Sequence, residues 1–312
     1  MRAWFAGIVA DERAADSRLP PARRLPCRQA PKGSILVPPD KPVLLTGASG
    51  TIGRLLTERL TALGWTLRLT DLVPFPSPLP TGATFERIDL EDRTAVRDLA
   101  KGCGLILHFG GVSTEQSFEA ILGPNLRGGF HIYEAAREEK ARVVYGSSNH
   151  AVGLYERSTI LDDDCLLRPD GFYGLSKAYG ELLARLYWEK HAVESVLIRI
   201  GSVLPEVPDE RILSTWISHN DFVRLIECCA AAPSVGCMVM WGASNNSRSF
   251  WRRDARDRLG WTPLDSADDQ ADRVLGRVTD SPVAERYQGG KFVIVDYTRT
   301  DFAPSAMFPD KE

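Results

Sequence analysis

VLLTGASGTIG, residues 43–53, leads from a short apolar strand through a glycine-rich turn into a helix whose apolar residues recur at helical spacing. Gly47, Gly50 and Gly53 let the backbone approach a pyrophosphate, and the helix N-terminus supplies N–H donors to the phosphate oxygens. Glycines at this spacing also occur in purely structural turns. The stretch therefore predicts the first strand and helix of a parallel sheet, and it leaves a nucleotide site and a structural turn as two interpretations.

Short β-rich runs alternate with helical runs along most of the chain that follows. Further strands are expected at 66–70, 105–110, 142–146, 195–200 and 237–241, and helices near 92–100, 124–139, 172–190 and 221–231. This alternation predicts an α/β fold with a doubly wound parallel sheet of Rossmann type and a small C-terminal portion.

The composition is that of a globular protein, with 44% hydrophobic and 25% charged residues. A net charge of −3 gives no basic field for nucleic acid, and no apolar run approaches the roughly 18 residues that span a membrane. Six cysteines without a C-x-x-C pair fit a reducing cytoplasm, and the start of the chain matches a signal peptide only weakly. Residues 1–40, interrupted by prolines, are expected to be a disordered extension before a single domain at 41–312.

Asp71 lies 18 residues after Gly53, at the end of the second expected strand. A carboxylate at this place accepts hydrogen bonds from the adenine ribose hydroxyls and repels a 2′-phosphate. The nearest base, Arg68, lies inside the strand and does not compensate for that charge. The pattern favours NAD over NADP, against the simpler interpretation of Asp71 as a polar residue that ends a strand.

Tyr173 and Lys177 are four residues apart at the start of an amphipathic helix, so both side chains lie on one face. Lowering a tyrosine pKa by ~3 units, from near 10, needs roughly 4 kcal/mol, for which the ammonium group and a positive nicotinamide are available sources. The pair predicts a general base and its cation. Tyr287 and Lys291 repeat the spacing, but two glycines between them disfavour a helix, and we expect no catalytic pair there.

Ser148, in VVYGSSNH after the strand expected at 142–146, is the candidate to bind the substrate oxygen. Ser147 is the competing assignment, and such a polar run is by itself often only a turn. His150 has no second histidine at a metal-binding spacing, and three adjacent acids at 162–164 alternate direction in a loop. We therefore expect no metal.

Together these residues resemble the extended short-chain dehydrogenase/reductases and, within them, the uronate dehydrogenase subfamily. The resemblance covers about residues 42–295, while 1–40 have no counterpart and 250–286 match loosely. It is carried by TGASGTIG (46–53), IDL (88–90), HFGGVS (108–113), NLRGGFHIYEAAR (125–137), SSNHAVG (147–153), RPDGFYGLSKAYGE (168–181), RIGSV (199–203), RILSTWISHNDFV (211–223), WGAS (241–244) and YQGGKF (287–292).

The resemblance implies oxidation of the anomeric C1 hydroxyl of cyclic D-galacturonate or D-glucuronate to an aldarolactone, with NAD⁺ as the oxidant. Tyr173 would take the hydroxyl proton, Lys177 would hold the nicotinamide ribose and lower the tyrosine pKa, and Ser148 would steady the oxygen. Substrate-binding elements would lie mainly in 202–220 and 242–295. The implied substrate contacts are Ser113, Ser148, Asn149, His150, which would donate to a sugar hydroxyl, Ser202 and Arg211. Besides Gly47, Gly50 and Gly53, the implied cofactor contacts are Thr51, Ile52, Asp71, Leu72, Asp89, Leu90, Phe109, Gly110, Gly111, Tyr173, Lys177 and Val203.

Arg211 matters most for the choice of substrate. A uronic acid differs from a neutral sugar by its carboxylate, and a guanidinium offers a planar pair of donors that recognises one. The alternative is a solvated surface arginine, as most arginines are.

Two other functions stay open. A nucleotide-sugar epimerase or dehydratase of the same superfamily would need room for a nucleoside diphosphate, and only 265 residues follow Gly47. A non-catalytic NAD-sensing protein would not need Ser148, Tyr173 and Lys177. The resemblance also implies a homo-oligomer.

Overall fold

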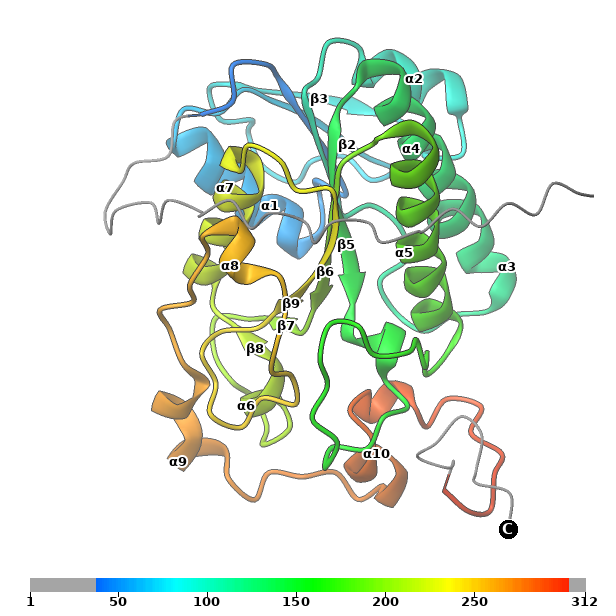
Figure 1. The fold of residues 1–312 in the computed structure, drawn as a ribbon, viewed down its shortest axis with the longest axis vertical. Coiled ribbons are helices and arrows are strands. Elements are labelled where there is room, and N and C mark those ends of the chain that lie inside the picture. Colours follow the sequence, from blue (N-terminus) through cyan, green and yellow to red (C-terminus); the bar gives the residue numbers. More distant parts are fainter. Residues whose placement is uncertain (1–37, 303–312) are drawn as a thin grey trace, which may run out of the picture.

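The computed structural model describes residues 38–302, and the predicted extension at 1–40 lies almost entirely outside them. A seven-stranded parallel sheet in the order β3-β2-β1-β4-β5-β6-β9 forms the centre (Figure 1). Chain order reverses between β1 and β4, so the sheet is doubly wound and the predicted fold class is confirmed. The strands are β1 (Val43–Thr46), β2 (Leu67–Asp71), β3 (Ala83–Arg87), β4 (Leu105–His108), β5 (Arg142–Ser148), β6 (Ser195–Ile200) and β9 (Cys237–Gly242).

Helices cover both faces of this sheet (Figure 1). One face carries α1 (Thr51–Ala62), α7 (His219–Ala231) and α8 (Arg256–Leu259). The other carries α2 (Arg93–Ala100), α3 (Phe118–Ile121), α4 (Gly128–Glu139) and α5 (Phe172–His191). The helix predicted at 124–139 is regular only from Gly128, because a π-helical turn, Leu122–Arg127, precedes it. Within residues 38–302, no helix is long and apolar enough to cross a membrane.

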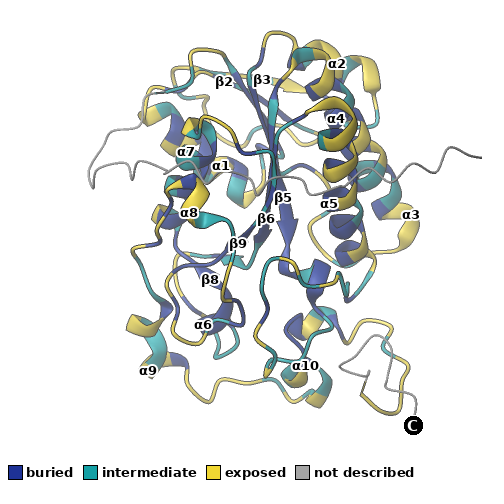
Figure 2. Ribbon diagram, viewed as in Figure 1, coloured by how far each residue is buried: buried dark blue, intermediate teal, exposed yellow. Residues whose placement is uncertain are grey.

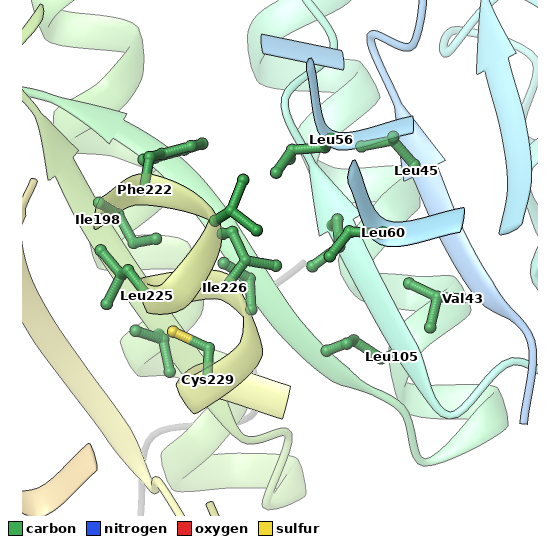
Figure 3. Close-up of a cluster of buried hydrophobic side chains, with 14 of the residues drawn as sticks. Val43, Leu45, Leu56, Leu60, Leu105, Ile198, Phe222, Leu225, Ile226 and Cys229 are labelled. Atoms are coloured by element: carbon green, nitrogen blue, oxygen red, sulfur yellow. The ribbon is translucent and has the colours of Figure 1, made fainter. Parts of the chain in front are cut away.

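The hydrophobic core has one layer on each face of the sheet. Val43 and Leu45 of β1 pack with α1 and α7 (Figure 3). Leu44 points to the opposite layer, with α2, α4 and α5. The central strands are therefore buried on both sides (Figure 2). This explains why β1 and β4 are unbroken apolar runs in the sequence and show no alternation.

Strand β3 is absent from the predicted strands. It lies at the edge of the sheet, where β2 is its neighbour. At the carboxyl ends of the two strands, Asp71 of β2 pairs with Arg87 of β3. Its sequence, ATFER, has no buried residue, so no apolar signal marks it.

The remaining elements gather beyond the carboxyl ends of the strands (Figure 1). A short parallel pair holds this portion together, with Val207, Leu213, Trp216 and Val274 in a small core of its own. Its elements are β7 (Ser202–Val203), α6 (Ile212–Thr215), β8 (Trp216–Ile217), α9 (Ala271–Val274) and α10 (Pro282–Arg286). Within residues 38–302, the 3₁₀ turns are Asn149–Val152, Ala267–Gln270 and Gly290–Phe292.

Candidate functional site

A cavity of about 510 Å³ lies at the carboxyl ends of β1, β4, β5 and β6, where the strand order reverses. This is the usual ligand position in a doubly wound sheet. The predicted residues that line it are Gly47, Gly50, Thr51, Ile52, Gly53, Asp71, Phe109, Gly111, Ser113, Ser148, Asn149, His150, Tyr173, Lys177 and Val203. Four predicted cofactor contacts do not line it, namely Leu72, Asp89, Leu90 and Gly110. Their roles remain predictions.

The glycine turn packs so closely against neighbouring backbone that side chains do not fit at two of its positions. Gly47 has φ +73°, and a Cβ there would lie 2.6 Å from the carbonyl group of Phe109. A Cβ on Gly53 would lie 2.1 Å from the Gly47 oxygen. These contacts require glycine, and the turn they permit presents the N-terminus of α1 to the cavity. The geometry fits a pyrophosphate.

Asp71 lies at the end of β2, with its carboxylate against this turn. Oδ2 accepts a hydrogen bond from the Ser49 amide at 3.0 Å. Arg68 points elsewhere, because its guanidinium donates to the carbonyl oxygens of Leu99 and Lys101 at 3.1 and 2.5 Å. The Asp71 carboxylate therefore lies at the cavity without Arg68 beside it to neutralise its charge. This suits the binding of a ribose that carries no 2′-phosphate.

Arg87 is a base that the sequence analysis does not consider. It stands opposite Asp71 in the register of β2 and β3, and its Nε donates to the carbonyl oxygen of Leu72 at 2.7 Å. The pairing could not be foreseen, because β3 itself is not visible in the sequence pattern.

Tyr173 lies in the first turn of α5, whose N-terminus is held by a residue from another segment. Gly171 precedes the helix and has no side chain to cap it, and Glu115 accepts hydrogen bonds from the amides of Phe172 and Tyr173 at 2.7 and 2.9 Å. A carboxylate at a helix N-terminus satisfies free N–H groups and interacts favourably with the helix dipole. Glu115 thus connects the loop that carries Ser113 to the N-terminus of α5.

The side chains of Tyr173 and Lys177 are both buried and share one face of α5. The Lys177 Nζ lies 5.5 Å from the centre of the Tyr173 ring and 5.3 Å from that of Tyr145. Burial lowers the pKa of Lys177 to about 8. Burial raises the pKa of Tyr173 to about 12, and a hydrogen bond with the Ser148 side chain offsets part of that rise. The protein alone therefore keeps Tyr173 protonated, and a further positive charge is needed to favour its phenolate form.

The two candidate serines point in different directions. The Ser148 side chain lies close enough to Tyr173 to lower its pKa, and its hydroxyl oxygen accepts a hydrogen bond from the His150 amide at 3.2 Å. Ser147 instead donates to Glu181 at 2.6 Å, inside a buried network in which Arg199 also donates to that carboxylate at 3.0 and 2.9 Å. This geometry favours Ser148 as the group that contacts a substrate oxygen.

A second cavity of about 250 Å³ adjoins the first and shares His150 with it. Ser202 and Arg211 line it, and Arg211 is partly buried, which lowers its pKa to about 10. Its guanidinium is therefore not freely solvated, and its role stays a prediction. Nε and Nη2 of Arg211 donate to the carbonyl oxygen of Gln288 at 2.8 and 2.5 Å. The side-chain amide of Asn149 can be oriented so that its nitrogen donates to the carbonyl oxygen of Ile200. In this orientation its oxygen accepts a hydrogen bond from Nη2 of Arg211 at 3.1 Å.

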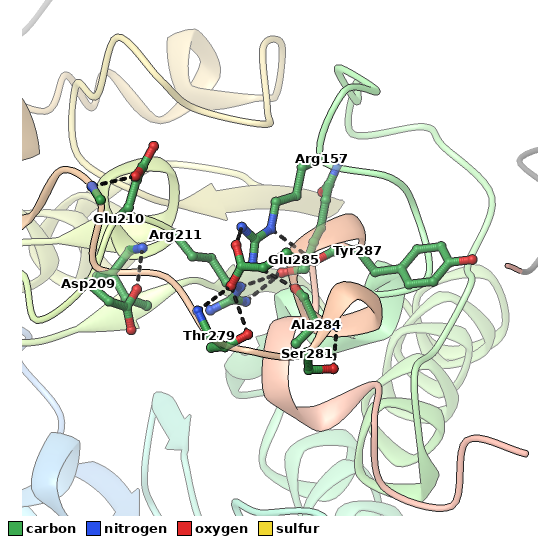
Figure 4. A network of polar contacts seen from close by, with 12 residues as sticks. Arg157, Asp209, Glu210, Arg211, Thr279, Ser281, Ala284, Glu285 and Tyr287 are labelled. Carbon is green, nitrogen blue, oxygen red and sulfur yellow. Dashed lines mark hydrogen bonds and ion pairs between the residues drawn. The ribbon is translucent and has the colours of Figure 1, made fainter.

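The walls of this cavity come largely from the C-terminal segment (Figure 4). Arg157 pairs with Glu285 at 2.5 Å and donates to the carbonyl oxygens of Ala284 and Tyr287 at 2.7 and 3.3 Å. Glu285 also accepts from the amide and hydroxyl of Thr279, both at 2.9 Å. This network fixes the segment that follows, residues 287–292.

Residues 287–292, YQGGKF, include the second Tyr-x-x-x-Lys spacing. Tyr287 follows the end of α10 and Lys291 lies in a later 3₁₀ turn, so the expectation that they do not form a helical pair is confirmed. The segment nevertheless shapes the site; it lies within the range 242–295 expected to hold substrate-binding elements, although none of its residues is among the predicted contacts. Gly290, at φ +62°, passes so close to Arg211 that a Cβ would lie 2.6 Å from its Nε, and the Phe292 ring stacks on His150 at 4.0 Å.

Among residues 38–302, no group of three or more His, Cys, Asp or Glu side chains is arranged to hold a metal ion.

Known proteins are similar to this chain in sequence and in fold. The model of the NAD dependent epimerase/dehydratase family matches residues 43–251. Uronate dehydrogenase of Agrobacterium fabrum is 45% identical over 258 residues, covering 81% of this chain and 97% of that protein. Uronate dehydrogenase of Pseudomonas putida is 42% identical over 264 residues, covering 82% and 97%. A crystal structure of a mutant uronate dehydrogenase from Agrobacterium tumefaciens complexed with NAD is 43% identical, with a TM-score of 0.77, covering 81% of this chain and 97% of that one. The chain belongs to the NAD dependent epimerase/dehydratase family.

Proposed function

We propose that this protein oxidises the C1 hydroxyl of cyclic D-galacturonate or D-glucuronate with NAD⁺, giving the aldarolactone and NADH. The similarity to uronate dehydrogenases over four fifths of the chain supports the reaction class. The observation that carries the substrate is a partly buried arginine in a cavity joined to the Tyr173 site through His150. A partly buried cation beside a proton-accepting group suits an acidic sugar.

The cofactor fits the larger cavity. The glycine turn and the start of α1 would hold the pyrophosphate, and Asp71 would accept the hydroxyls of the adenine ribose. When bound, NAD⁺ would supply the acceptor for the C1 hydride and a positively charged nicotinamide. Lys177, which has no hydrogen-bond partner among residues 38–302, would donate to the nicotinamide ribose.

Tyr173 then acts as the general base. Ser148 and Tyr173 line the same cavity, and Ser148 lies close enough to lower the tyrosine pKa, so a substrate oxygen held by Ser148 would lie within reach of the phenolate. The pKa of about 12 must fall for Tyr173 to take a proton near neutral pH, and two positive charges, Lys177 and the oxidised nicotinamide, act in that direction. Each contributes most in a site from which water is excluded.

Arg211 meets the substrate carboxylate through one nitrogen. Of its five N–H donors, the one on Nε and one on Nη2 point to Gln288, and the other on Nη2 points to Asn149. The two N–H groups of Nη1 are left for the C6 carboxylate. The contact is therefore narrower than the two-nitrogen fork expected from the sequence.

We also propose a homo-oligomer that packs through the outer face of α5. Leu175, Leu182 and Leu186 share this face and are 47%, 64% and 48% exposed, and Phe172 beside them contacts Phe118 at 5.8 Å. Leu182→Glu should lower the mass measured by light scattering, whereas an unchanged mass would reject this face.

We infer a cytoplasmic location. The five cysteines at 103, 165, 228, 229 and 237, all within the described residues, are free thiols, as is usual in a reducing compartment.

The direct test is NADH formation, followed by absorbance, with galacturonate, glucuronate, galactose or glucose as substrate. We expect turnover with the uronates and little with the neutral sugars. No turnover with either uronate would reject the proposal. Protein that is purified with tightly held NAD and converts a nucleotide sugar without net NADH would instead support an epimerase or dehydratase.

A further inference from the structure

His150 is hydrogen-bonded to a carboxylate that has no access to solvent. Its Nδ1 lies 2.7 Å from Oδ2 of Asp170, whose side chain is 0% exposed. Three glycines from three segments make room for this carboxylate. A Cβ on Gly153 or Gly289 would lie 1.9 Å from Oδ2, and one on Gly174 would lie 2.9 Å from Oδ1. The chain thus excludes side chains on several sides of Asp170.

This burial is costly. Oδ1 of Asp170 has no hydrogen-bond partner among residues 38–302, and His150 is the one side chain there with which the carboxylate forms a hydrogen bond. A buried, poorly satisfied carboxylate destabilises a fold. A role in the site accounts for its presence better than a role in stability.

The histidine ring is held in place on its other sides. Phe292 stacks on it at 4.0 Å with an angle of 14° between the rings, and the edge of Tyr173 meets it at 5.7 Å. The ring lines both cavities. Because Nδ1 is engaged by Asp170, Nε2 is the ring nitrogen left for a ligand.

We propose that Asp170 is a positioning residue that keeps the proton of neutral His150 on Nδ1, so that Nε2 accepts a hydrogen bond from a uronate hydroxyl. An ionised carboxylate only accepts, so the bond to Asp170 needs a proton on Nδ1. In a neutral imidazole the second nitrogen then carries a lone pair. This reverses the direction expected from the sequence, where His150 donates.

The charges around the pair suit a neutral ring. Arg211 lines the same cavity, and its interaction with Asp170 is favourable, so this carboxylate already balances the charge of one neighbouring cation. Arg157 adds a second positive charge, paired with Glu285, and Asp209 faces Arg211. A proton on Nε2 would place a further cation next to Arg211.

The consequence is selection of the sugar by its hydroxyl pattern. The proposal rests on a uronate as substrate, with its carboxylate at Arg211 and its C1 at Tyr173. A fixed acceptor between these two anchors requires a hydroxyl hydrogen at that point of the ring. Removing the acceptor should weaken substrate binding more than the chemical step, because the bond exists before and during hydride transfer.

The tautomer can be observed directly. The chain has five histidines, so selective ¹⁵N-histidine labelling followed by long-range ¹H–¹⁵N correlation at pH 8 gives five ring patterns, and His150→Gln identifies one by its loss. His131 is an internal standard, because its Nδ1 lies 2.8 Å from the Leu90 carbonyl oxygen and must carry a proton to bond there. We expect His150 to match His131. A proton on Nε2, alone or on both nitrogens, would overturn the proposal.

Two substitutions connect the tautomer to function. Asp170→Ala should abolish the His131-like pattern of His150 and raise KM for galacturonate about tenfold, equivalent to about 1.4 kcal/mol, with kcat changed less than threefold. Asp170→Asn keeps an acceptor oxygen and should retain both the tautomer and most of the affinity. The matched control, Asp164→Ala, removes an exposed acid of the same loop and should change neither.

The outcomes separate this proposal from the proposed function. If the wild-type protein shows the Nδ1–H tautomer but no uronate turnover, the substrate is wrong and the pairing stands. If uronates turn over and Asp170→Ala leaves KM unchanged while NADH affinity and melting temperature are normal, the positioning role is wrong. Should Asp170→Ala fail to fold, the wild-type spectrum and the Asp170→Asn variant still decide the tautomer.

Discussion

Arg211 donates two hydrogen bonds to the main-chain oxygen of Gln288, 77 residues further along the chain. Because the acceptor is a backbone carbonyl, the orientation of the guanidinium depends on the path of residues 287–292 and not on a side chain of that segment. The C-terminal segment and the carboxylate-binding group are thus one structural unit.

Substitution of Arg211 should therefore separate uronates from neutral sugars. We expect Arg211→Met to raise KM for galacturonate about 10- to 100-fold, since hydrogen bonds to a charged group contribute about 1.5–3 kcal/mol. NADH affinity, measured by fluorescence titration, should stay within twofold. Arg185→Gln, which removes an exposed ion pair with Glu189, is the control. An equal loss for galactose and galacturonate would contradict a carboxylate contact.

The backbone of Gly290 should matter for the same reason. Gly290→Ala puts a Cβ within 2.6 Å of the Arg211 Nε, in addition to the strain of φ +62°. We expect a higher KM and a loss of about 1–3 kcal/mol in unfolding free energy. Gly260→Ala has a similar φ of +66° but meets nothing within 4 Å, so it should lose about 1 kcal/mol and leave KM unchanged. Equal behaviour of the two variants would show that Gly290 does not hold Arg211.

Asp71 should set the choice of cofactor. Asp71→Asn removes the charge that repels a 2′-phosphate while keeping the shape of the side chain, and Arg87 stands opposite in the register. We expect the ratio of kcat/KM for NAD⁺ to that for NADP⁺ to fall at least about tenfold, an effect of roughly 1.4 kcal/mol. Initial rates with both cofactors measure it. A ratio unchanged from the wild type would mean that Asp71 serves only to bind the Ser49 amide.

The buried charge of Lys177 should lower the free energy of unfolding, although the side chain is needed for activity. Its pKa falls from 10.5 to about 8 on folding, so the folded state disfavours the charged form. The penalty, roughly 3 kcal/mol, is complete below pH 8 and fades as the pH rises toward 10.5. We expect Lys177→Met to be inactive and yet more stable than the wild type in urea unfolding at pH 7, with a smaller difference at pH 10. A variant less stable at pH 7 would contradict an unpaired buried ammonium.

The sequence could predict those parts of the site that depend on local pattern. The glycine turn, Asp71 at a strand end and the spacing of Tyr173 and Lys177 on α5 all follow from short-range periodicity, and each lies at the cavity. The buried strands of the sheet were equally predictable, because they are apolar runs separated by amphipathic helices, whereas the exposed edge strand β3 was not.

Contacts between distant segments could not be predicted. Which segments meet in space is not encoded by any local pattern. It decides the pairing of Asp71 with Arg87 on β3, the burial of Asp170 and the contact of Gln288 with Arg211. The two glycines at 289 and 290 were a usable signal. They were correctly interpreted as helix breakers. Glycine is also required where the backbone passes close to another group, and both of these glycines lie at such a position.

Replacement of Tyr173 by phenylalanine tests the central claim most directly. The substitution removes one oxygen and leaves the ring that packs against His150 and Phe292. With galacturonate and NAD⁺ we expect kcat to fall about 10²- to 10⁴-fold, the usual contribution of a general base, while the Kd for NADH stays within about threefold. A Tyr173→Phe enzyme that binds NADH and forms it at a near-normal rate would show that another group takes the proton.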